Sequence, residues 1–462
     1  MTFDEKLKAR AQREGSPTPE GFDERMDALL HNLPEQVTPI KKRRAPRTAV
    51  CIGIAAALVV GAAAATPTVI QMAQGVIDYF HTGRASEYTA LQTEYEQFNA
   101  AVGASKTVDG VTLTINNIAV DDSYMSIFFT MKSDTPLNQI GTDSEPESWR
   151  ASWTAPVFWA KVNGKELDTS GMVDNEAYFV DDYTLKGVHR LTLKETLPEQ
   201  FDLLLYTSGT SRLNEGDIQF ELSVDKSAVA VETRTVEPKQ DFTVDISWKT
   251  DEGEPLHQHY EPRVERVSIS PFGSTITLSE RGTAPFDSFV LRDDKGNYLP
   301  VLETSGTVGS SFERLSNSFE FMGADLDTKS ITLIPCVDSG YAHKVSGTLD
   351  SLPLTDDSTN GFTLESLEMG DRQATAKFSF RGVVPVGHVN FTLQLADGTL
   401  LDHVTDCFMD FRYDRENELC ITTIEYPNAT DEQIAQITGV VFAQPDDDLE
   451  LLEDQAVTIN LQ

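Results

Sequence analysis

Residues 108–134 read VDGVTLTINNIAVDDSYMSIFFTMKSD and contain two short apolar runs that decide the fold class. The runs VTLTINNIAV and SIFFTMKS, from Val111 and Ser126, are rich in β-branched and aromatic residues, which is typical of strands. Similar runs, FTVDISWK, SITLIPCV and FTLESLEM, begin at Phe242, Ser330 and Phe362. Only residues 431–436 add a helical segment in this region. The sequence therefore predicts a mainly β fold built from antiparallel sandwiches, and not a βαβ fold.

A hairpin motif occurs three times, as VFWAKVNGKELD, SFVLRDDKGNYLP and NFTLQLADGTLLD. The turn glycines are Gly164, Gly296 and Gly398, and glycine accepts the positive φ that tight hairpin turns require. Their spacing is close to one immunoglobulin-like domain of about 100 residues. We expect three tandem immunoglobulin-like β-sandwich modules, at residues 106–238, 239–352 and 353–462. The alternative is that several glycine turns occur in any β-rich chain.

Composition limits the classes of function. The chain has 462 residues, of which 40% are hydrophobic and 24% charged, as in a globular protein with several domains. The formal net charge of -36 repels phosphate backbones and argues against direct nucleic-acid binding. Four cysteines are too few for a disulfide-stabilised scaffold, and no pair has CxxC spacing.

An uncharged apolar run occupies residues 48–70 and is long enough for a helix that spans the ~30 Å hydrocarbon core. Five basic residues precede it: Lys41, Lys42, Arg43, Arg44 and Arg47. By the positive-inside rule, residues 1–47 lie in the cytoplasm and the acidic region after the run lies outside the cell membrane. We expect a single-pass protein anchored in the lipid bilayer, with a juxtamembrane helical stalk at residues 71–105.

Two other interpretations of the apolar run stay open. A cleaved signal peptide would use the small residues 62–65, and a buried core helix would need no membrane. We favour an uncleaved anchor because the preceding segment is longer than a signal-peptide n-region and because the basic cluster ends where the run begins. Small residues recur at every fourth position: Ala49, Gly53, Ala57, Gly61 and Ala65. This stripe predicts a homodimer through the membrane helix, or it arises by chance from the Ala-rich composition.

The segment TPEGFDERMDALLHNLPEQV at residues 18–37 predicts an amphipathic helix in the cytoplasmic tail. Its apolar side consists of Phe22, Met26, Leu29, Leu30 and Leu33. A tail of this size cannot bury that stripe in a core of its own, so we expect it to bind a partner groove, a second copy or the inner leaflet. Alternatively, it packs on the segment around Phe3 and Leu7.

The sequence offers little catalytic chemistry. HExxH, GxSxG and GxxxxGK[ST] motifs are absent from it. SVDK at residues 223–226 spells SxxK without companion motifs, and we attribute it to chance. His257 and His259 fall on one face of a predicted strand without a third ligand, and the acidic residues 446–448 lack the EF-hand pattern. We therefore expect no enzyme, no cofactor and no metal site.

The cysteines suggest one disulfide at most. Cys51 lies in the apolar run as a filler, while Cys407 and Cys420 flank the polar residues YDRENE. The latter two could face each other across a hairpin and form a disulfide in an oxidising compartment. The odd cysteine, Cys336, argues against a chain that relies on such bonds.

Four phrases carry a resemblance to a known family: KKRRAPR before the apolar run, VIDYF at residues 76–80, VDGVTLTINNIAVDDSYMSIFFTMKSD and SISPFGSTITL. With them the chain resembles a bacterial membrane-anchored family with a domain of unknown function (DUF4179-like), often paired with extracytoplasmic-function sigma factors. The resemblance covers the tail, the apolar run, the stalk and the first two modules. It implies an anti-sigma tail and no catalytic residues. The HxxxCxxC motif of zinc-containing anti-sigma domains is absent from the sequence.

Two functions follow as hypotheses. In the first, the outer modules sense a ligand, a wall component or stress, and the tail helix holds a cytoplasmic sigma factor at the membrane. In the second, the chain is an envelope adhesion or structural protein whose modules bind the wall or neighbouring cells. An enzyme ranks behind both.

Overall fold

The computed structural model describes most residues from Val69 onward. The segments described are residues 69–82, 87–137, 147–169, 174–208, 216–249, 255–282, 286–305, 314–337, 342–370, 372–384, 389–405, 412–414, 417–445 and 449–462. The tail helix, the basic cluster, the small-residue stripe and nearly all of the predicted span fall in residues 1–68 and so lie outside them. Within the described segments, no helix combines the length and the apolar character needed to cross a membrane.

Val69 and Ile70, the last two residues of the predicted span, belong instead to strand β1 (Val69–Gln71). The end of the span predicted from hydropathy is therefore wrong by two residues. Hydropathy alone does not separate the end of a membrane helix from an apolar strand, and the backbone of β1 pairs in parallel with β10 (Gln219–Asp225).

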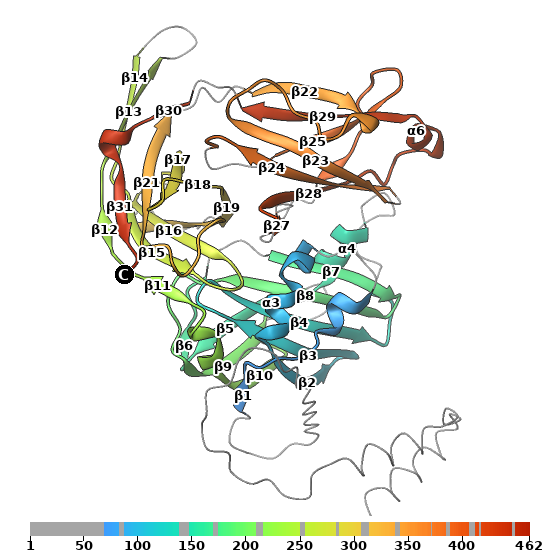
Figure 1. The fold of residues 1–462 in the computed structure, drawn as a ribbon. Helices are drawn as coiled ribbons and strands as arrows, with labels where there is room; N and C mark the ends of the chain where they lie inside the picture. Colours follow the sequence, from blue (N-terminus) through green and yellow to red (C-terminus); the bar gives the residue numbers. More distant parts are fainter. Residues whose placement is uncertain are drawn as a thin grey trace, which may run out of the picture. The chain divides into compact units, whose positions relative to one another are not determined.

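The first hydrophobic core lies between two five-stranded sheets (Figure 1). One has the order β1-β10-β9-β5-β6, with β9 at Gln200–Thr207, β5 at Phe158–Val162 and β6 at Lys165–Glu166. The other has the order β2-β3-β4-β8-β7, with β2 at Ala100–Val108, β3 at Val111–Val120, β4 at Tyr124–Ser133, β8 at Thr184–Thr192 and β7 at Asp174–Asp181. Buried residues alternate along β9, as expected when one face of a strand meets a core. We call these sheets the first sheet pair.

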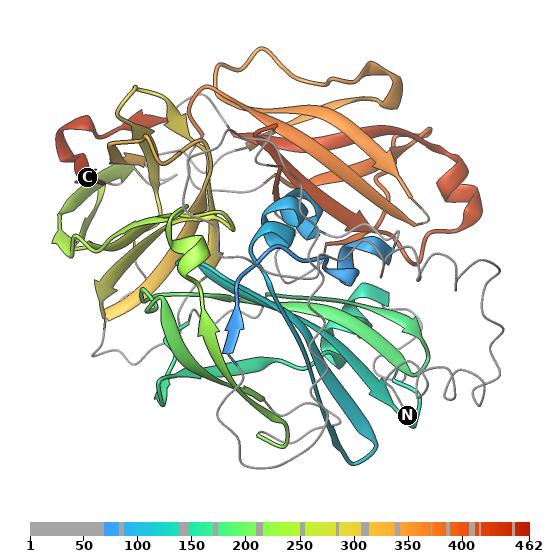
Figure 2. The same ribbon diagram turned by 60° about the horizontal axis from the view of Figure 1, so that its bottom comes forward.

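Short helices cover part of the first sheet pair. They are η1 (Asp78–Thr82), η2 (Glu87–Leu91), α3 (Gln92–Gln97), α4 (Glu147–Thr154) and α5 (Ser227–Ala230). In the segment predicted as a stalk, Tyr95 of α3 packs edge to face on Phe128 of β4, with 5.3 Å between the ring centroids. Its aromatic side chains belong to the first core, and the segment lies beside the β2-β3-β4-β8-β7 sheet (Figure 2).

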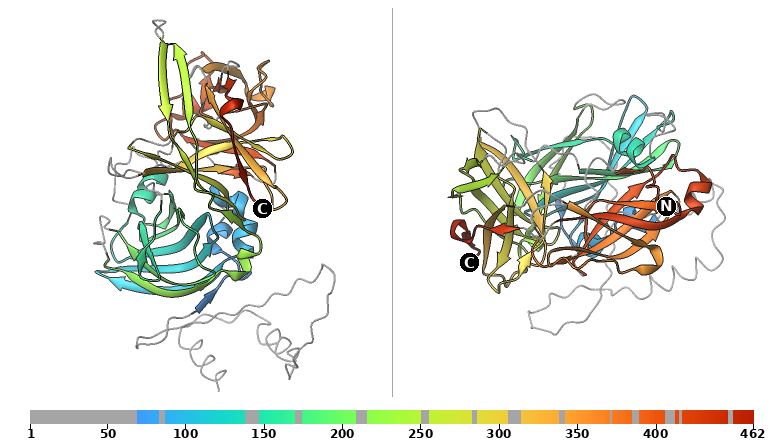
Figure 3. Two further views of the ribbon diagram at one scale, coloured as in Figure 1. Left: turned by 90° about the vertical axis from the view of Figure 1, so that its left-hand side faces the viewer. Right: turned by 90° about the horizontal axis from the view of Figure 1, so that it is seen from above.

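The second core is enclosed by a group of sheets that we call the second sheet group. One sheet has the order β11-β15-β16-β20-β19, with β12 also on β15; its strands are β11 Arg234–Val236, β12 Gln240–Asp241, β15 Arg263–Ile269, β16 Ser274–Arg281, β19 Val301–Ser305 and β20 Arg314–Phe321. Another has the order β18-β17-β21-β30, with β31 also on β21; its strands are β17 Phe289–Asp293, β18 Tyr298–Leu299, β21 Ser330–Val337, β30 Glu450–Leu451 and β31 Val457–Asn460. β13 (Val244–Lys249) and β14 (Pro255–Tyr260) form a separate hairpin that is seen clearly in Figure 3.

The third core lies between the sheets of the third sheet pair. One has the order β22-β29-β25, with β22 at Ala342–Thr348, β29 at Ile437–Pro445 and β25 at Phe391–Leu395. The other has the order β23-β24-β28-β26, with β27 also on β28; its strands are β23 Gly361–Met369, β24 Gln373–Arg381, β26 Val404–Thr405, β27 Arg412–Asp414 and β28 Leu419–Glu425. Helices η3 (Leu349–Ser351), α6 (Asp431–Ala435) and η4 (Glu453–Gln455) complete the described elements.

These elements confirm the mainly β character and the antiparallel sheets that the sequence predicted. The three glycines of the hairpin motif all have positive φ: 81° at Gly164, 91° at Gly296 and 88° at Gly398. The first strand of each motif has an equivalent partner later in the chain: β5 pairs with β9, β17 with β21, and β25 with β29. The three sheet groups therefore share a strand order as well as a turn.

The second and third groups exchange one strand. In the first pair, β9 is followed by β10, and the two strands pair with each other. In the second group, β21 is followed by β22, but β22 pairs with β29 of the third pair. The strand that pairs with residues 330–333 of β21 is instead β31, which comes after β29 in the chain. The limit predicted between residues 352 and 353 thus separates β22 and β31 from the sheets that they join, because the sequence of a strand does not specify its partner.

Candidate functional site

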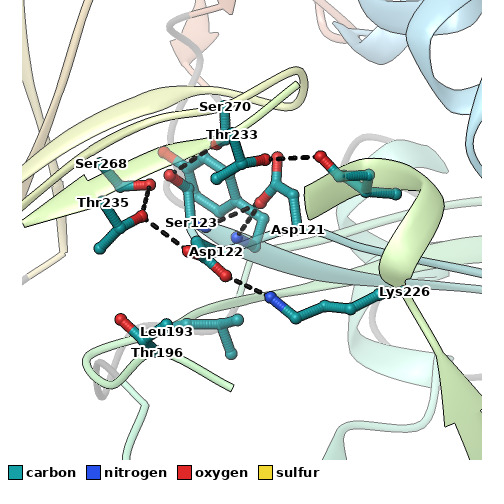
Figure 4. Close-up of polar contacts among 12 residues, drawn as sticks. Asp121, Asp122, Ser123, Leu193, Thr196, Lys226, Thr233, Thr235, Ser268 and Ser270 are labelled. Carbon is teal, nitrogen blue, oxygen red and sulfur yellow. Dashed lines mark hydrogen bonds and ion pairs between the residues drawn. The ribbon is translucent and has the colours of Figure 1, made fainter. Parts of the chain in front are cut away.

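The connection between β3 and β4 places three consecutive polar residues in the interior. Asp121, Asp122 and Ser123 have 0%, 7% and 0% of their surface exposed. They contact residues of the second sheet group and the residue that follows β10 (Figure 4). Buried polar groups need partners, since an unsatisfied one costs about 1–3 kcal/mol. The partners therefore show how the two groups are joined, and we call this set the junction cluster.

Asp121 stabilises the connection and links it to the second group. Its carboxylate accepts hydrogen bonds from the backbone N–H groups of Ser123 at 2.7 Å and Tyr124 at 2.8 Å. The other carboxylate oxygen accepts from the backbone N–H of Phe272, between β15 and β16, at 2.8 Å. Burial raises the pKa of the Asp121 carboxyl above 3.8, because these hydrogen bonds offset the loss of hydration only in part.

Asp122 forms the charged centre of the cluster. The ammonium group of Lys226, which has 3% of its surface exposed, forms a short ion pair with Asp122. The hydroxyl of Thr235 in β11 donates to the second oxygen of the same carboxylate at 2.7 Å, and it also lies 3.0 Å from the hydroxyl of Ser268 in β15. One carboxylate thus binds a residue of the first sheet pair and a residue of the second group.

Arg266 in β15 closes the cluster from the second group. Its side chain has 1% of its surface exposed and lies at the irregularity in the register between β15 and β16. It donates to the main-chain oxygen of Asp122 and, at 3.3 Å each, to the main-chain oxygen of Leu193 and the hydroxyl of Thr196. Burial lowers the pKa of Arg266, while nearby carboxylates act in the opposite direction.

A second set of contacts crosses the same junction. The guanidinium carbon of Arg190, in β8, lies 3.3 Å from the ring centroid of Tyr124. Arg190 also donates to the main-chain oxygen of Phe272 at 3.0 Å, and Tyr124 donates to Glu320 of β20 at 2.9 Å. The ring of Phe272 in turn stacks on Tyr95, with 4.7 Å between the centroids, and belongs to the first core. Cation, aromatic and apolar contacts therefore act together here.

The cluster is built for structure. Its carboxylates, hydroxyls and cations bind one another in the interior. These contacts hold the first sheet pair and the second group in a defined orientation. Among the described residues, no group of three or more His, Cys, Asp or Glu side chains is arranged to hold a metal ion.

Sequence reasoning missed this cluster. In the sequence Lys226 stood out only as part of the SVDK pattern. In the structure this pattern is the end of β10 followed by a buried lysine. Asp-Asp-Ser between two strong strand runs was the other available signal. His257 and His259 do lie in β14, where His257 bonds Ser247 at 2.7 Å and His259 bonds Asp245 at 2.8 Å across the hairpin. Both bonds are between exposed side chains.

Of the two cysteines of the predicted disulfide, the structure describes only Cys420. Cys420 is a buried free thiol in β28, and Cys407 lies outside the described residues. Cys336 is buried in β21.

Comparison with known proteins relates part of the chain to a family. No curated protein matches the chain. Among solved structures, the crystal structure of the conserved domain protein from Bacillus anthracis is similar with a TM-score of 0.35 and 12% sequence identity, covering 84% of this chain and 99% of that one. The family model described as a domain of unknown function (DUF4179) matches residues 40–133. These residues run from the basic cluster to the end of β4 and include the Asp-Asp-Ser connection. The DUF4179-like resemblance predicted from the sequence is thereby confirmed for residues 40–133, which match this family model, while the resemblance to anti-sigma factors stays a prediction.

Proposed function

We propose that the chain is a single-pass membrane regulator with an extracytoplasmic β-rich sensing region and a cytoplasmic tail that binds a sigma factor. The apolar run at 48–70, the basic residues before it and the stripe from Phe22 to Leu33 support the topology and the tail. In this proposal the described residues lie outside the cell membrane, and an unidentified ligand or wall component acts on them.

One structural relationship carries the proposal. β1 begins at Val69, within the last two residues of the apolar run, and Gln71 pairs with Asp225 at the end of β10. The backbone N–H of Met72 adds a hydrogen bond to the main-chain oxygen of Asp225 at 2.9 Å. The next residue, Lys226, forms the buried ion pair with Asp122. A continuous path of backbone hydrogen bonds and buried charges thus leads from the second sheet group to the strand that follows the proposed anchor.

That path suits a regulator because tightly packed elements transmit a displacement from one to the next, whereas flexible segments between them do not. A long polar linker after the anchor would isolate the tail from events outside. Here β1, the first strand, pairs directly with β10. A conformational change in the second group therefore has a short route to the proposed anchor. The route leads through the junction cluster, whose contacts are buried.

The three sheet groups also support the finer architecture that we propose: three immunoglobulin-like sandwich modules, with limits near residues 238 and 352 and with β22 and β31 exchanged. The stripe of Gly53, Ala57, Gly61 and Ala65 supports a homodimer through the membrane helix.

A pull-down from bacterial lysate with the full chain tests the proposed function. The double variant Met26→Asp and Leu29→Asp removes the apolar stripe, while Glu24→Gln and Asp27→Asn change the polar side of the same predicted helix. We expect a sigma factor with the natural chain and with the polar-side control, and loss of it with the apolar-side variant. Equal recovery by both variants would overturn tail binding; recovery of no sigma factor by any chain would favour the adhesion protein.

A further inference from the structure

A cavity of about 240 Å³ lies where the second sheet group meets the third sheet pair. Its wall on one side is β18 with Tyr298 and Leu299, and on the other side it is the end of β24 with Phe380 and the turn before β28 with Glu418. The volume is just below the roughly 300–1,000 Å³ typical of ligand pockets, so it suits a small molecule. Sites at the meeting of two folded parts are common places for ligands.

The lining combines aromatic rings with an acid. Tyr298 and Phe380 offer the faces or edges of their rings, Leu299 and Val384 add apolar surface, and Glu418 adds a carboxylate. Among the described residues that line the cavity, none carries a positive charge. Aromatic rings and a carboxylate attract organic ammonium groups, the former through the ring quadrupole and the latter through its charge.

Tyr298 already binds one cation. The guanidinium carbon of Arg292 lies 5.8 Å from the centroid of its ring. The charge of Arg292 is matched by Glu453, which accepts two hydrogen bonds from it at 2.7 Å and 2.9 Å. Arg292 thus forms its ion pair with Glu453.

Glu418 is held in place while its carboxylate stays available. Its φ of 54° is unusual for a residue other than glycine. The preceding Asn417 is fixed by Asp414, to which it donates from its backbone N–H at 3.1 Å and from its side chain at 2.9 Å. The Glu418 side chain forms no hydrogen bond or ion pair with any described residue. Glu418 is exposed and also lines the cavity.

We propose that this cavity binds a small organic cation, an ammonium group that carries alkyl substituents. The substituents lie against Phe380, Tyr298 and Leu299, and the positive charge faces Glu418. The net charge of -36 raises the local concentration of such cations. The lining residues named here lie outside the tail, so the proposal does not depend on what the tail binds.

Choline is a suitable probe, with 3,3-dimethylbutan-1-ol as its uncharged isostere. The full chain in an uncharged maltoside detergent is titrated with each compound by calorimetry and by saturation-transfer NMR. We expect saturable binding of choline and none of the isostere. Glu418→Gln and Phe380→Leu should each weaken choline binding about fivefold. Glu221→Gln, on an exposed position of β10, should leave binding unchanged.

Three results would overturn the proposal: no saturable binding of choline to the natural chain, equal binding of choline and its isostere, or natural affinity in the Glu418→Gln variant. Glu418 is exposed, so its substitution should not disturb folding, and circular dichroism of each variant checks this.

Discussion

The ammonium group of Lys226 lies against the carboxylate of Asp122, and both side chains are buried between the first sheet pair and the second sheet group. Removing one partner of a buried pair leaves an uncompensated charge in the interior, which costs about 3–5 kcal/mol. We therefore expect Lys226→Met to lower the free energy of unfolding by about 3 kcal/mol. Urea unfolding followed by tryptophan fluorescence measures this, since Trp159 lies in β5.

Lys165→Met is the matched control. Lys165 also pairs with a carboxylate, that of Glu195 at 3.1 Å, but 74% of its side chain is exposed. Exposed pairs contribute less than about 1 kcal/mol, so this variant should unfold nearly as the natural chain does. The double variant Asp122→Asn and Lys226→Met should recover part of the loss. Equal stability of the two lysine variants would contradict a buried ion pair.

The strand exchange makes the second core depend on β31. Ile459 is fully buried and pairs with Ile331 of β21, so Ile459→Ala should destabilise the second core by about 3 kcal/mol. The control is Thr458→Ala, because Thr458 is exposed and its hydroxyl lies 3.0 Å from the hydroxyl of Thr332. Hydrogen exchange of residues 330–337 measures the effect. Unchanged protection of β21 in Ile459→Ala would show that β31 pairs elsewhere.

Asp356 links the stability of the third sheet pair to acid pH. Burial acts to raise its pKa, but hydrogen bonds from His343, Gln444, Arg381 and Ser358 outweigh burial, so the pKa in the folded chain lies below 3.8. The carboxylate therefore favours the folded state at a pH above about 4, and this contribution is lost as the pH falls from 3.8 toward the folded pKa.

Asp356→Asn should accordingly lower the free energy of unfolding by about 2 kcal/mol near neutral pH. The difference from the natural chain should shrink near a pH of about 3. Asp357→Asn changes the exposed neighbour and should have little effect at either pH. Urea unfolding of the three chains at both pH values measures these differences, and a pH-independent gap would count against the assignment.

Cys420 should be chemically inert in the folded chain. Burial raises the pKa of its thiol to about 12, even though a hydrogen bond from Thr422 acts in the opposite direction. Because the thiolate is the reactive form, iodoacetamide at a pH of about 8 should leave Cys420 unmodified, and urea should expose it to modification. Mass spectrometry of the digest measures this. A peptide that joins Cys407 to Cys420 in a non-reduced digest would instead establish the disulfide.

Local features of the sequence predicted the strands and turns. VTLTINNIAV became β3, and SIFFTMKS lies within β4, because β-branched and aromatic side chains favour a pleated, buried surface. Gly164, Gly296 and Gly398 took the positive φ that their turns require. The helical segment at 431–436 is α6, which Thr430 and Gln433 begin with a capping box. Each of these depends on neighbours in the chain.

Features that depend on distant residues escaped prediction. Lys226 and Arg266 look like surface residues in the sequence, and only their partners at Asp122 and Leu193 explain their burial. The exchange of β22 and β31 was hidden for the same reason, since both strands would read alike in either sheet.

The exchange also orders events during synthesis. β31 leaves the ribosome after every other described strand, yet it completes a sheet whose neighbour β21 was made more than a hundred residues earlier. A product cut short by a premature stop before Val457 would leave residues 330–333 of β21 without the strand that pairs with them, which is the kind of edge that aggregates or attracts proteases. The second core can therefore be completed only after β31 has been synthesised.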